Sequence, residues 1–211
     1  MKDLIIIGAG GFGREVLSYA LEIQEQGHNE WRIKGFINDI EDALDSFDIE
    51  YPILGPIKGH IPLENAVYIC AIGDSEARLR IGKEFLNRGA IFTNIIASGV
   101  TLRERNTIGV GNIICPGSGT SPDVKIGNFT LINAGVGIGH DSTIEDGVTI
   151  GPRTEITGNC KIGECVYIGA GAIITPKRRI GTGAKICAGA VIFTHVKPGK
   201  TMLGNPARVL K

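Results

Sequence analysis

Two polar residues interrupt an otherwise apolar repeat in the second half of the sequence. In the segment 132–147 (INAGVGIGHDSTIEDG), His140 and Asp141 stand among glycine and aliphatic residues. An imidazole ordinarily changes its protonation state near neutral pH, so a histidine can accept the proton of an attacking nucleophile. A neighbouring carboxylate can hold the second ring nitrogen and stabilise the imidazolium. The pair predicts a general base for acyl transfer, provided that the backbone turns here, because adjacent strand residues face opposite sides.

Other interpretations of these polar residues stay open on the sequence alone. His140 can also be a solvent-exposed turn residue. His195, in IFTHVKPGK, is a competing base, but it lies where the repeat ends, so we expect it at the surface near a cofactor. Asn133, seven residues before His140, is either a turn asparagine or a side chain that orients the reacting group.

A glycine loop near the start of the chain is the second candidate for chemistry. Gly8, Gly10 and Gly13 satisfy the pattern GxGxxG after an apolar run and before a helical pattern, which suits a phosphate at a helix N-terminus. The loop can hold a nucleotide-linked substrate, hold a nicotinamide dinucleotide or be a structural turn. Asp39 follows Gly13 by twenty-six residues rather than about twenty, and only 1–95 are free for the domain, so a full dinucleotide fold is disfavoured.

The elements that must position these residues divide the chain in two. Residues 1–95 alternate apolar runs with amphipathic segments, which indicates a Rossmann-like α/β domain with a parallel sheet. Ser75 is the expected cap of the second helix. The pattern predicts strands within 3–13, 31–39 and 66–74 and helices over 14–27 and 75–89.

The remainder, residues 96–211, follows a period of six. Reading every sixth residue from 96 to 192 gives seventeen positions, of which fifteen are isoleucine; the exceptions are Leu102 and Thr120. An α-helix requires apolar residues three and four apart, so a period of six fits a helix poorly. This hexapeptide period is typical of a parallel β-helix, with three hexads in each triangular coil and between five and six coils in all.

The coil length also predicts which backbone lies beside His140. Gly158 follows His140 by eighteen residues, which is one full coil, so the two residues should stack. Acyl transfer from a thioester needs a hydrogen-bond donor that stabilises the developing oxyanion, and a backbone N–H at a glycine can supply it.

Composition limits the remaining function classes. The 22 basic and 22 acidic residues balance, so no net field favours nucleic acid or a membrane surface. The apolar run LIIIGAG is too short to span a bilayer, and the five cysteines form no CxxC pair. No cluster of His, Cys, Asp and Glu has metal-ligand spacing. We therefore expect a cytoplasmic protein with reduced thiols, without metal.

Six motifs occur in this order along the chain: IIIGAGGFGREV, FIND, AIGDSEAR, NAGVGIGHD, EITGNCKIG and GNPARV. Their order and spacing are similar to those of the sialic acid O-acetyltransferase family, which includes the NeuD- and PglD-like UDP-4-amino-sugar N-acetyltransferases. This resemblance implies a left-handed β-helix, a homotrimer, acetyl-CoA as co-substrate and clefts shared between neighbouring prisms.

The resemblance also implies roles for particular residues. His140 aligns with the family's base, Asp141 with the acidic residue that follows it and Gly158 with the oxyanion amide. Relatives often carry polar residues in the loop (GASGHG) where this chain has Gly11 and Phe12. Residues implied in the sugar-nucleotide pocket are Gly8, Gly10, Gly11, Phe12, Gly13, Asn38, Asp39, Gly73, Asp74 and Arg78. Residues implied near acetyl-CoA are Gly158, Ala170, Ala188, Lys197, Lys200, Gly204, Pro206 and Arg208.

The sequence therefore predicts an acetyl-CoA-dependent N-acetyltransferase that acts on a UDP-linked amino sugar by direct transfer. A sialic acid hydroxyl is the alternative acceptor. A non-catalytic protein that only binds a sugar nucleotide is the alternative of another class.

Overall fold

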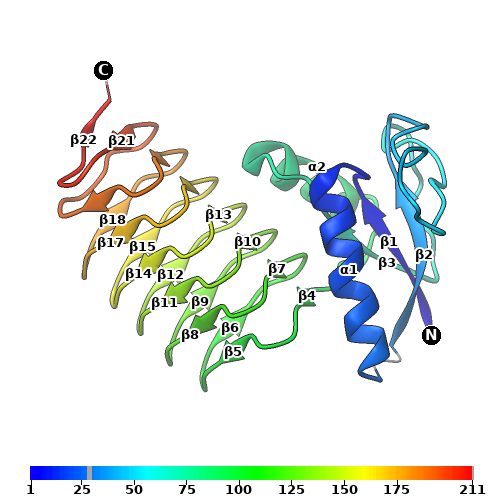
Figure 1. Cartoon of the computed structure of the whole chain (residues 1–211), viewed down its shortest axis with the longest axis horizontal. Helices are drawn as coiled ribbons and strands as arrows, with labels where there is room; N and C mark the ends of the chain where they lie inside the picture. Colours follow the sequence, from blue (N-terminus) through cyan, green and yellow to red (C-terminus); the bar gives the residue numbers. More distant parts are fainter. Residues whose placement is uncertain (28–29, 211) are drawn as a thin grey trace.

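The structure, a computed structural model, describes residues 1–27 and 30–210. A small α/β domain lies beside a ladder of short coils, and the chain ends at the far tip of that ladder (Figure 1). The order of the elements follows the two halves of the sequence, because the helices occur only before Ile95 in the described residues and short strands follow it.

The α/β domain contains a three-stranded parallel sheet with the strand order β2-β1-β3. The central strand β1 is fully apolar in its second half, and Leu4 to Ile7 have no exposed surface. Because the crossovers place α1 and α2 against the sheet, its carboxyl edge collects the loops that follow each strand. The elements are β1 (Lys2–Ile7), α1 (Gly11–Glu25), β2 (Trp31–Ile37), β3 (Ala66–Cys70) and α2 (Ser75–Asn87).

Helix α1 begins earlier than expected, whereas helix α2 begins at Ser75 as expected but has a different cap. Helix α1 starts at Gly11, because Gly10 occupies the N-cap position and the glycine loop itself forms the first turn. Helix α2 is capped by Asp74 rather than by Ser75: the Asp74 carboxylate accepts a hydrogen bond of 2.8 Å from the N–H of Ala77. The Ser75 hydroxyl is instead 2.8 Å from the hydroxyl of Thr149 in the second domain.

The second domain is a left-handed parallel β-helix with three faces, in which each strand pairs with the strand one coil away. Face 1 contains β4 (Ile95–Ile96), β7 (Ile113–Ile114), β10 (Leu131–Ile132), β13 (Thr149–Ile150), β16 (Tyr167–Ile168), β19 (Lys185–Ile186), β21 (Thr201–Leu203) and β22 (Arg208–Val209). Face 2 contains β5 (Thr101–Leu102), β8 (Gly119–Thr120), β11 (Gly137–Ile138), β14 (Glu155–Ile156), β17 (Ile173–Ile174) and β20 (Val191–Ile192). Face 3 contains β6 (Thr107–Ile108), β9 (Lys125–Ile126), β12 (Thr143–Ile144), β15 (Lys161–Ile162) and β18 (Arg179–Ile180).

The hexad isoleucines fill the interior of this prism. Ile132, Ile150 and Ile168 stack eighteen residues apart on face 1, and each is at most 1% exposed. The chain passes from face 1 to face 2, then to face 3 and back, so each coil has three corners. We name them by the faces that they join: corner 1–2, corner 2–3 and corner 3–1. The inward strand positions of the coils are aliphatic except at Thr120, and the buried hydroxyls of Ser118 and Ser142 donate to backbone carbonyls. Exposed reactive groups can therefore occur only at corners and outward positions.

The α/β domain packs on the lower half of face 1 and on corner 3–1. The outward side chains of face 1, Ile113 and Leu131, join the apolar core around α1. At the corner, the ring of Phe129 meets Phe92 edge-to-face with centroids 4.8 Å apart. Face 1 is therefore covered at its lower coils and open above them.

Candidate active site

The backbone does turn at the predicted base. Asp141 adopts φ +60°, a left-handed conformation that aspartate tolerates better than most residues, at corner 2–3 between β11 and β12. This turn places the two side chains on the same side, and His140 Nδ1 lies 2.7 Å from Asp141 Oδ2. Both side chains are more than half exposed, at 60% and 55%. A carboxylate on Nδ1 fixes the tautomer in which Nδ1 carries the proton and Nε2 has the free lone pair.

Gly158 lies directly beside the His140 ring, one coil further along. The N–H of Asn159 donates to the His140 carbonyl at 2.8 Å, which fixes the stacking of the two coils. A Cβ at Gly158 would lie 2.7 Å from His140 Nε2, so any residue other than glycine at this position would displace the ring. Among the described residues the Gly158 N–H has no acceptor. A free backbone donor and the basic ring nitrogen thus occupy adjacent coils of one corner.

Asn133 and the two alanines expected near acetyl-CoA lie at a different corner. Asn133, Ala170 and Ala188 belong to corner 1–2, where Asn133 Oδ1 accepts from the N–H of Ala134 at 2.8 Å. Ala170 and Ala188 are exposed. Since face 2 separates corner 1–2 from corner 2–3, one chain does not bring these residues to His140.

His195 occupies the same corner as His140 but three coils further along. Coils are spaced by about 4.8 Å, so the two histidines are separated by roughly 14 Å along the prism. His195 Nδ1 accepts from the N–H of Arg179 at 3.1 Å and has no carboxylate partner among the described residues. The expected surface position of His195 agrees with this placement.

The glycine loop contains two glycines that the fold requires and one that it does not. A Cβ at Gly13 would collide with the Gly8 carbonyl, so Gly13 permits the close contact of α1 with β1. Gly8 has φ +98°, a conformation that favours glycine. A Cβ at Gly10 would meet nothing within 4 Å, and Gly10 makes no side-chain cap. The first turn of α1 is therefore open, with no acidic residue in it.

The polar residues after β2 hold the loops at the carboxyl edge. Asn38 Oδ1 accepts from the N–H of Ala9 at 3.1 Å, which ties this residue to the glycine loop. Asp39 Oδ1 accepts from the N–H groups of Ile57 and Lys58 at 2.9 and 3.1 Å. Both residues border the edge where a nucleotide is expected. Both side chains accept hydrogen bonds from backbone N–H groups of the loops at this edge.

Two other residues of this loop differ in their surroundings. Gly11 is exposed, and a Cβ there would have only the Arg14 guanidinium nearby, at 3.9 Å. Phe12 is half-buried and packs on the apolar core around α1. Phe12 is therefore mainly a packing residue, and Gly11 leaves space above the start of α1.

Arg78 does not line the nucleotide pocket, contrary to the sequence prediction. Its side chain has no exposed surface. The guanidinium donates to carbonyls on both sides of the domain junction, and burial lowers the pKa of Arg78 to about 10. Its acceptors are the carbonyl oxygens of Ile72, Gly73, Phe129, Gly147 and Val148 and the hydroxyl of Thr149, at 2.7–3.2 Å. A guanidinium that is satisfied in this way holds the two domains together and cannot reach a ligand.

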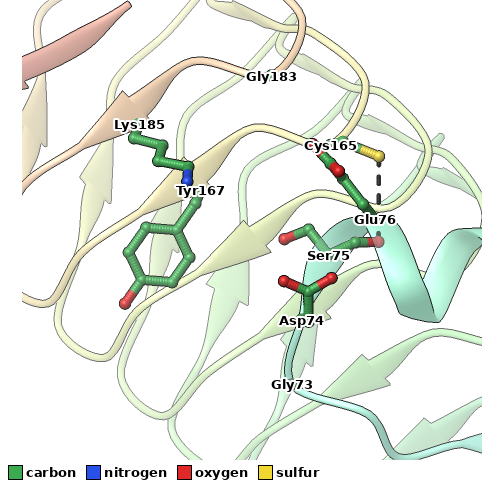
Figure 2. A pocket seen from close by; sticks show the side chains of 8 residues that line it. All are labelled: Gly73, Asp74, Ser75, Glu76, Cys165, Tyr167, Gly183 and Lys185. Carbon is green, nitrogen blue, oxygen red and sulfur yellow. Dashed lines mark hydrogen bonds between the residues drawn. The ribbon is translucent and has the colours of Figure 1, made fainter. Parts of the chain in front are cut away.

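A cleft of about 350 Å³ opens where the α/β domain meets the uncovered part of face 1 (Figure 2). Gly73 and Asp74, which the sequence predicts in the pocket, lie on one wall. Tyr167 and Lys185, which the sequence reasoning missed, lie on the other. The signal was present in the outward positions of face 1, which change from aliphatic residues in the lower coils to Tyr167 and Lys185 in the upper coils.

The C-terminal segment extends face 1 with a hairpin. Strand β21 pairs parallel with β19, and β22 returns antiparallel to β21. The residues expected near acetyl-CoA in this segment are all exposed: Lys197, Lys200, Gly204, Pro206 and Arg208. They are separated from His140 by several coils.

Among residues 1–27 and 30–210, no group of three or more His, Cys, Asp or Glu side chains is placed to hold a metal ion. Within the same residues, neither helix has the length and apolar character that a bilayer crossing requires.

Comparison with protein families and solved structures defines the group to which this arrangement belongs. The model of the PglD N-terminal domain matches residues 3–85. The model of the bacterial transferase hexapeptide (six repeats) matches residues 123–158 and 159–194. The acetyltransferase domain of PglB from Neisseria gonorrhoeae, in complex with acetyl coenzyme A, has a TM-score of 0.88 at 26% identity and covers 99% of each chain.

The α/β domain matches the PglD N-terminal domain, and the β-helix carries bacterial transferase hexapeptide repeats. WeeI from Acinetobacter baumannii matches this acetyltransferase over 100% of both chains, with a TM-score of 0.85 and 29% identity. A mutant of perosamine N-acetyltransferase from Caulobacter crescentus, in complex with CoA and GDP-perosamine, has a TM-score of 0.87. At 22% identity, over 100% of this chain and 98% of the other, that structure supports the shared fold alone. No curated protein matches the chain by sequence.

These findings confirm the predicted family, the α/β domain followed by a left-handed β-helix, and an acetyl-CoA-dependent acetyltransferase as the enzyme class.

Proposed function

We propose that this acetyltransferase transfers the acetyl group of acetyl-CoA directly to the amine of a UDP-linked amino sugar, with His140 as the general base. The observation that carries the proposal is the arrangement at corner 2–3. The Asp141 carboxylate holds Nδ1, and Nε2 faces a glycine whose N–H has no acceptor among the described residues. A base and an oxyanion donor on adjacent coils are what acyl transfer to an amine requires.

The roles of the residues follow from the protons and charges in that reaction. His140 Nε2 takes the proton that the amine loses as its nitrogen bonds to the thioester carbonyl carbon. Asp141 stabilises the imidazolium formed in this step. The Gly158 N–H stabilises the negative charge on the thioester oxygen. When the carbon–sulfur bond breaks, His140 returns its proton to the departing thiolate, so the base is regenerated and no acyl-enzyme is needed.

We propose that the active enzyme is a homotrimer in which one chain supplies His140 and a neighbour supplies the acceptor. The α/β domain covers face 1, whereas His140 lies at corner 2–3, on the opposite side of the prism. Asn133, Ala170 and Ala188 lie at corner 1–2 of the chain. The two groups of residues can meet only when corner 2–3 of one prism approaches corner 1–2 of another.

Light scattering in solution tests this assembly. We expect the mass of three chains at concentrations where the enzyme is active. A monomer with full activity would contradict the shared site.

We propose that the α/β domain binds the nucleotide of the acceptor. The open first turn of α1 offers N–H groups and a positive helix end to a diphosphate. Asn38 and Asp39 lie at the same sheet edge, where the uracil or ribose is expected. Because the loop lacks polar side chains at Gly11 and Phe12, the base and the sugar must be selected elsewhere. We propose a cytoplasmic location for this chemistry, which is supported by five cysteines that form no disulfide.

An acceptor panel tests the proposed function. Wild-type enzyme and acetyl-CoA are incubated with a UDP-linked 4-amino sugar, with GDP-perosamine and with free sialic acid, and thiol release is measured. We expect turnover with the UDP-linked amine. Turnover with sialic acid alone would favour O-acetylation. Tight binding of UDP-sugar by calorimetry with no thiol release would favour a non-catalytic protein.

A further inference from the structure

Corner 1–2 has an arginine in one coil where its other coils have glycine. The residue with the left-handed conformation at this corner is Arg153 in one of six coils, with φ +56°, and glycine in the other five: Gly99, Gly117, Gly135, Gly171 and Gly189. Residues with a Cβ are disfavoured in this conformation, so the position is strained for an arginine. Corners 2–3 and 3–1 contain several such residues, but Arg153 is the single exception at corner 1–2 among the described residues. Strain retained at one coil points to a role for the side chain.

The Arg153 side chain is exposed and leans toward the coil of His140. A Cβ at Gly135 would lie 3.6 Å from Arg153 Cγ, so the stem of the arginine lies over the bare backbone of Gly135. Gly135 belongs to the coil of β10, β11 and β12, which also contains His140. The guanidinium makes no hydrogen bond or ion pair within the described part of the chain. Glu155, two residues further along, extends over Gly137 on face 2 instead.

Corner 2–3 offers a carboxylate on the same coil. The lower coils of this corner carry Glu104, Asp123 and Asp141. Glu104 and Asp123 lie within ion-pair distance of Arg105 of their own chain, at 3.8 and 2.8 Å. Asp141 uses Oδ2 for the ring of His140, and its Oδ1 makes no hydrogen bond in residues 1–27 and 30–210. Asp141 is therefore the carboxylate at this corner that is free to bind an arginine.

The assembly proposed above brings the two corners together. In a trimer whose axis is parallel to the prisms, rotation keeps every coil at its own height, so a coil meets the same coil of the neighbouring chain. Arg153 leans onto the coil that contains Asp141, and corner 1–2 of one chain faces corner 2–3 of the next. Guanidinium–carboxylate hydrogen bonds are stronger than those between neutral groups. The charges and the heights of the two side chains therefore match across this contact.

We propose that Arg153 of one chain binds Asp141 Oδ1 of the neighbouring chain and thereby positions the His140–Asp141 pair. Both side chains of the pair are more than half exposed in one chain, and no other side chain described in that chain holds the carboxylate. Arg153 is a positioning residue in this role: it fixes the carboxylate, whose Oδ2 fixes Nδ1 and leaves Nε2 directed at the acceptor. The inference rests on the proposed function, because it requires the trimer and His140 as the base.

Arg153→Gly tests this role without disturbing the coil. Glycine is the residue of the other coils, so the variant removes the guanidinium and relieves the backbone strain. We expect kcat to fall about tenfold, the size expected for loss of a hydrogen bond between charged groups. KM for the UDP-linked 4-amino sugar, KM for acetyl-CoA and the mass by light scattering should stay close to the wild-type values. Arg153→Lys, which keeps the charge, should restore part of the lost turnover.

Mixed trimers test whether the arginine comes from the neighbour. Chains with His140→Ala and chains with Arg153→Gly are co-expressed with different tags, and trimers that carry both tags are purified. About a third of the contacts in each mixed trimer then join an intact His140 to an intact Arg153, so turnover should reach about a third of the wild-type value. The matched control mixes His140→Ala with Asp141→Asn. Both changes affect the same corner of one chain, so these trimers should show no gain over the separate variants.

Three outcomes overturn the proposal. Unchanged kcat in Arg153→Gly would show that the guanidinium does not act on the pair. A rise in KM for the sugar nucleotide at unchanged kcat would assign the guanidinium to the acceptor. No gain in the mixed trimers would place Arg153 in the site of its own chain. Failure of the proposed function looks different, because the wild type would then release no thiol with any acceptor, or would be fully active as a monomer.

Discussion

The α/β domain and the β-helix offer different kinds of group to a ligand. At the start of α1 the available donors are backbone N–H groups, and the polar side chains nearby are occupied in holding loops. At corner 2–3 the exposed groups are the side chains of His140 and Asp141, above a single backbone donor. Backbone donors suit tight binding of a diphosphate, whereas proton transfer needs a titratable side chain. This difference supports the proposal that the α/β domain binds the diphosphate and the β-helix carries out proton transfer.

The largest expected effect comes from removing the side chain that we propose as the general base. We expect His140→Ala to lower kcat at least about a hundredfold, the low end for loss of a general base. KM for acetyl-CoA should change little, because the imidazole acts on the acceptor's proton. Steady-state assays of thiol release check both constants.

His195→Ala is the matched control for that experiment. It removes a histidine from the same corner that lacks a carboxylate partner among the described residues. We expect turnover within about twofold of the wild type. If His195→Ala abolishes turnover while His140→Ala retains it, the base has been assigned to the wrong coil.

The junction between the two domains should be less stable to unfolding than the hydrophobic core of either domain. Arg78→Ala removes the donor from five carbonyls and the Thr149 hydroxyl at the domain junction and leaves a cavity in the same place. We expect the free energy of unfolding to fall by about 3 kcal/mol, since each unsatisfied buried acceptor costs about 1–3 kcal/mol. Thermal unfolding followed by circular dichroism measures the change.

Arg80→Ala, two residues further along α2 and exposed, is the control for loss of charge and helix propensity. Equal melting temperatures of the two variants would show that the Arg78 hydrogen bonds do not stabilise the domain junction.

The smallest expected effect tests whether the backbone N–H groups at the start of α1 bind the diphosphate. Gly10→Val places a branched side chain over the first turn of α1, where a Cβ meets no protein atom within 4 Å. We expect KM for the sugar nucleotide to rise about tenfold, which corresponds to about 1.4 kcal/mol, while KM for acetyl-CoA stays within a few-fold. The fold should persist, as circular dichroism would show.

Gly13→Ala provides the contrast, because its Cβ collides with the Gly8 carbonyl and should unfold the α/β domain. Tight binding of NADH by the wild type, without binding of any uridine nucleotide, would contradict the assignment of this domain to the acceptor.

The repeat made much of the fold predictable, because isoleucine every six residues leaves few alternatives to a β-helix. The stacking of Gly158 on His140 followed from the coil length of eighteen residues. Arg78 could not be placed in the same way. An arginine after a glycine-rich edge has the same appearance in sequence whether it binds a phosphate or the carbonyls of another domain. Tyr167 and Lys185 became visible only when the extent of the α/β domain on face 1 was known.

Coil stacking also limits how the length of this chain can vary. From Ile95 to Ile192 each strand residue lies beside the one eighteen positions away, as Ile132 lies beside Ile150 and Ile150 beside Ile168. Inserting or deleting six residues keeps the isoleucines inward but rotates everything beyond the change by one face. His140 would then leave its corner although the core stayed intact. Only changes of eighteen residues preserve both packing and register, so the prism can grow or shrink only by whole coils of about 4.8 Å.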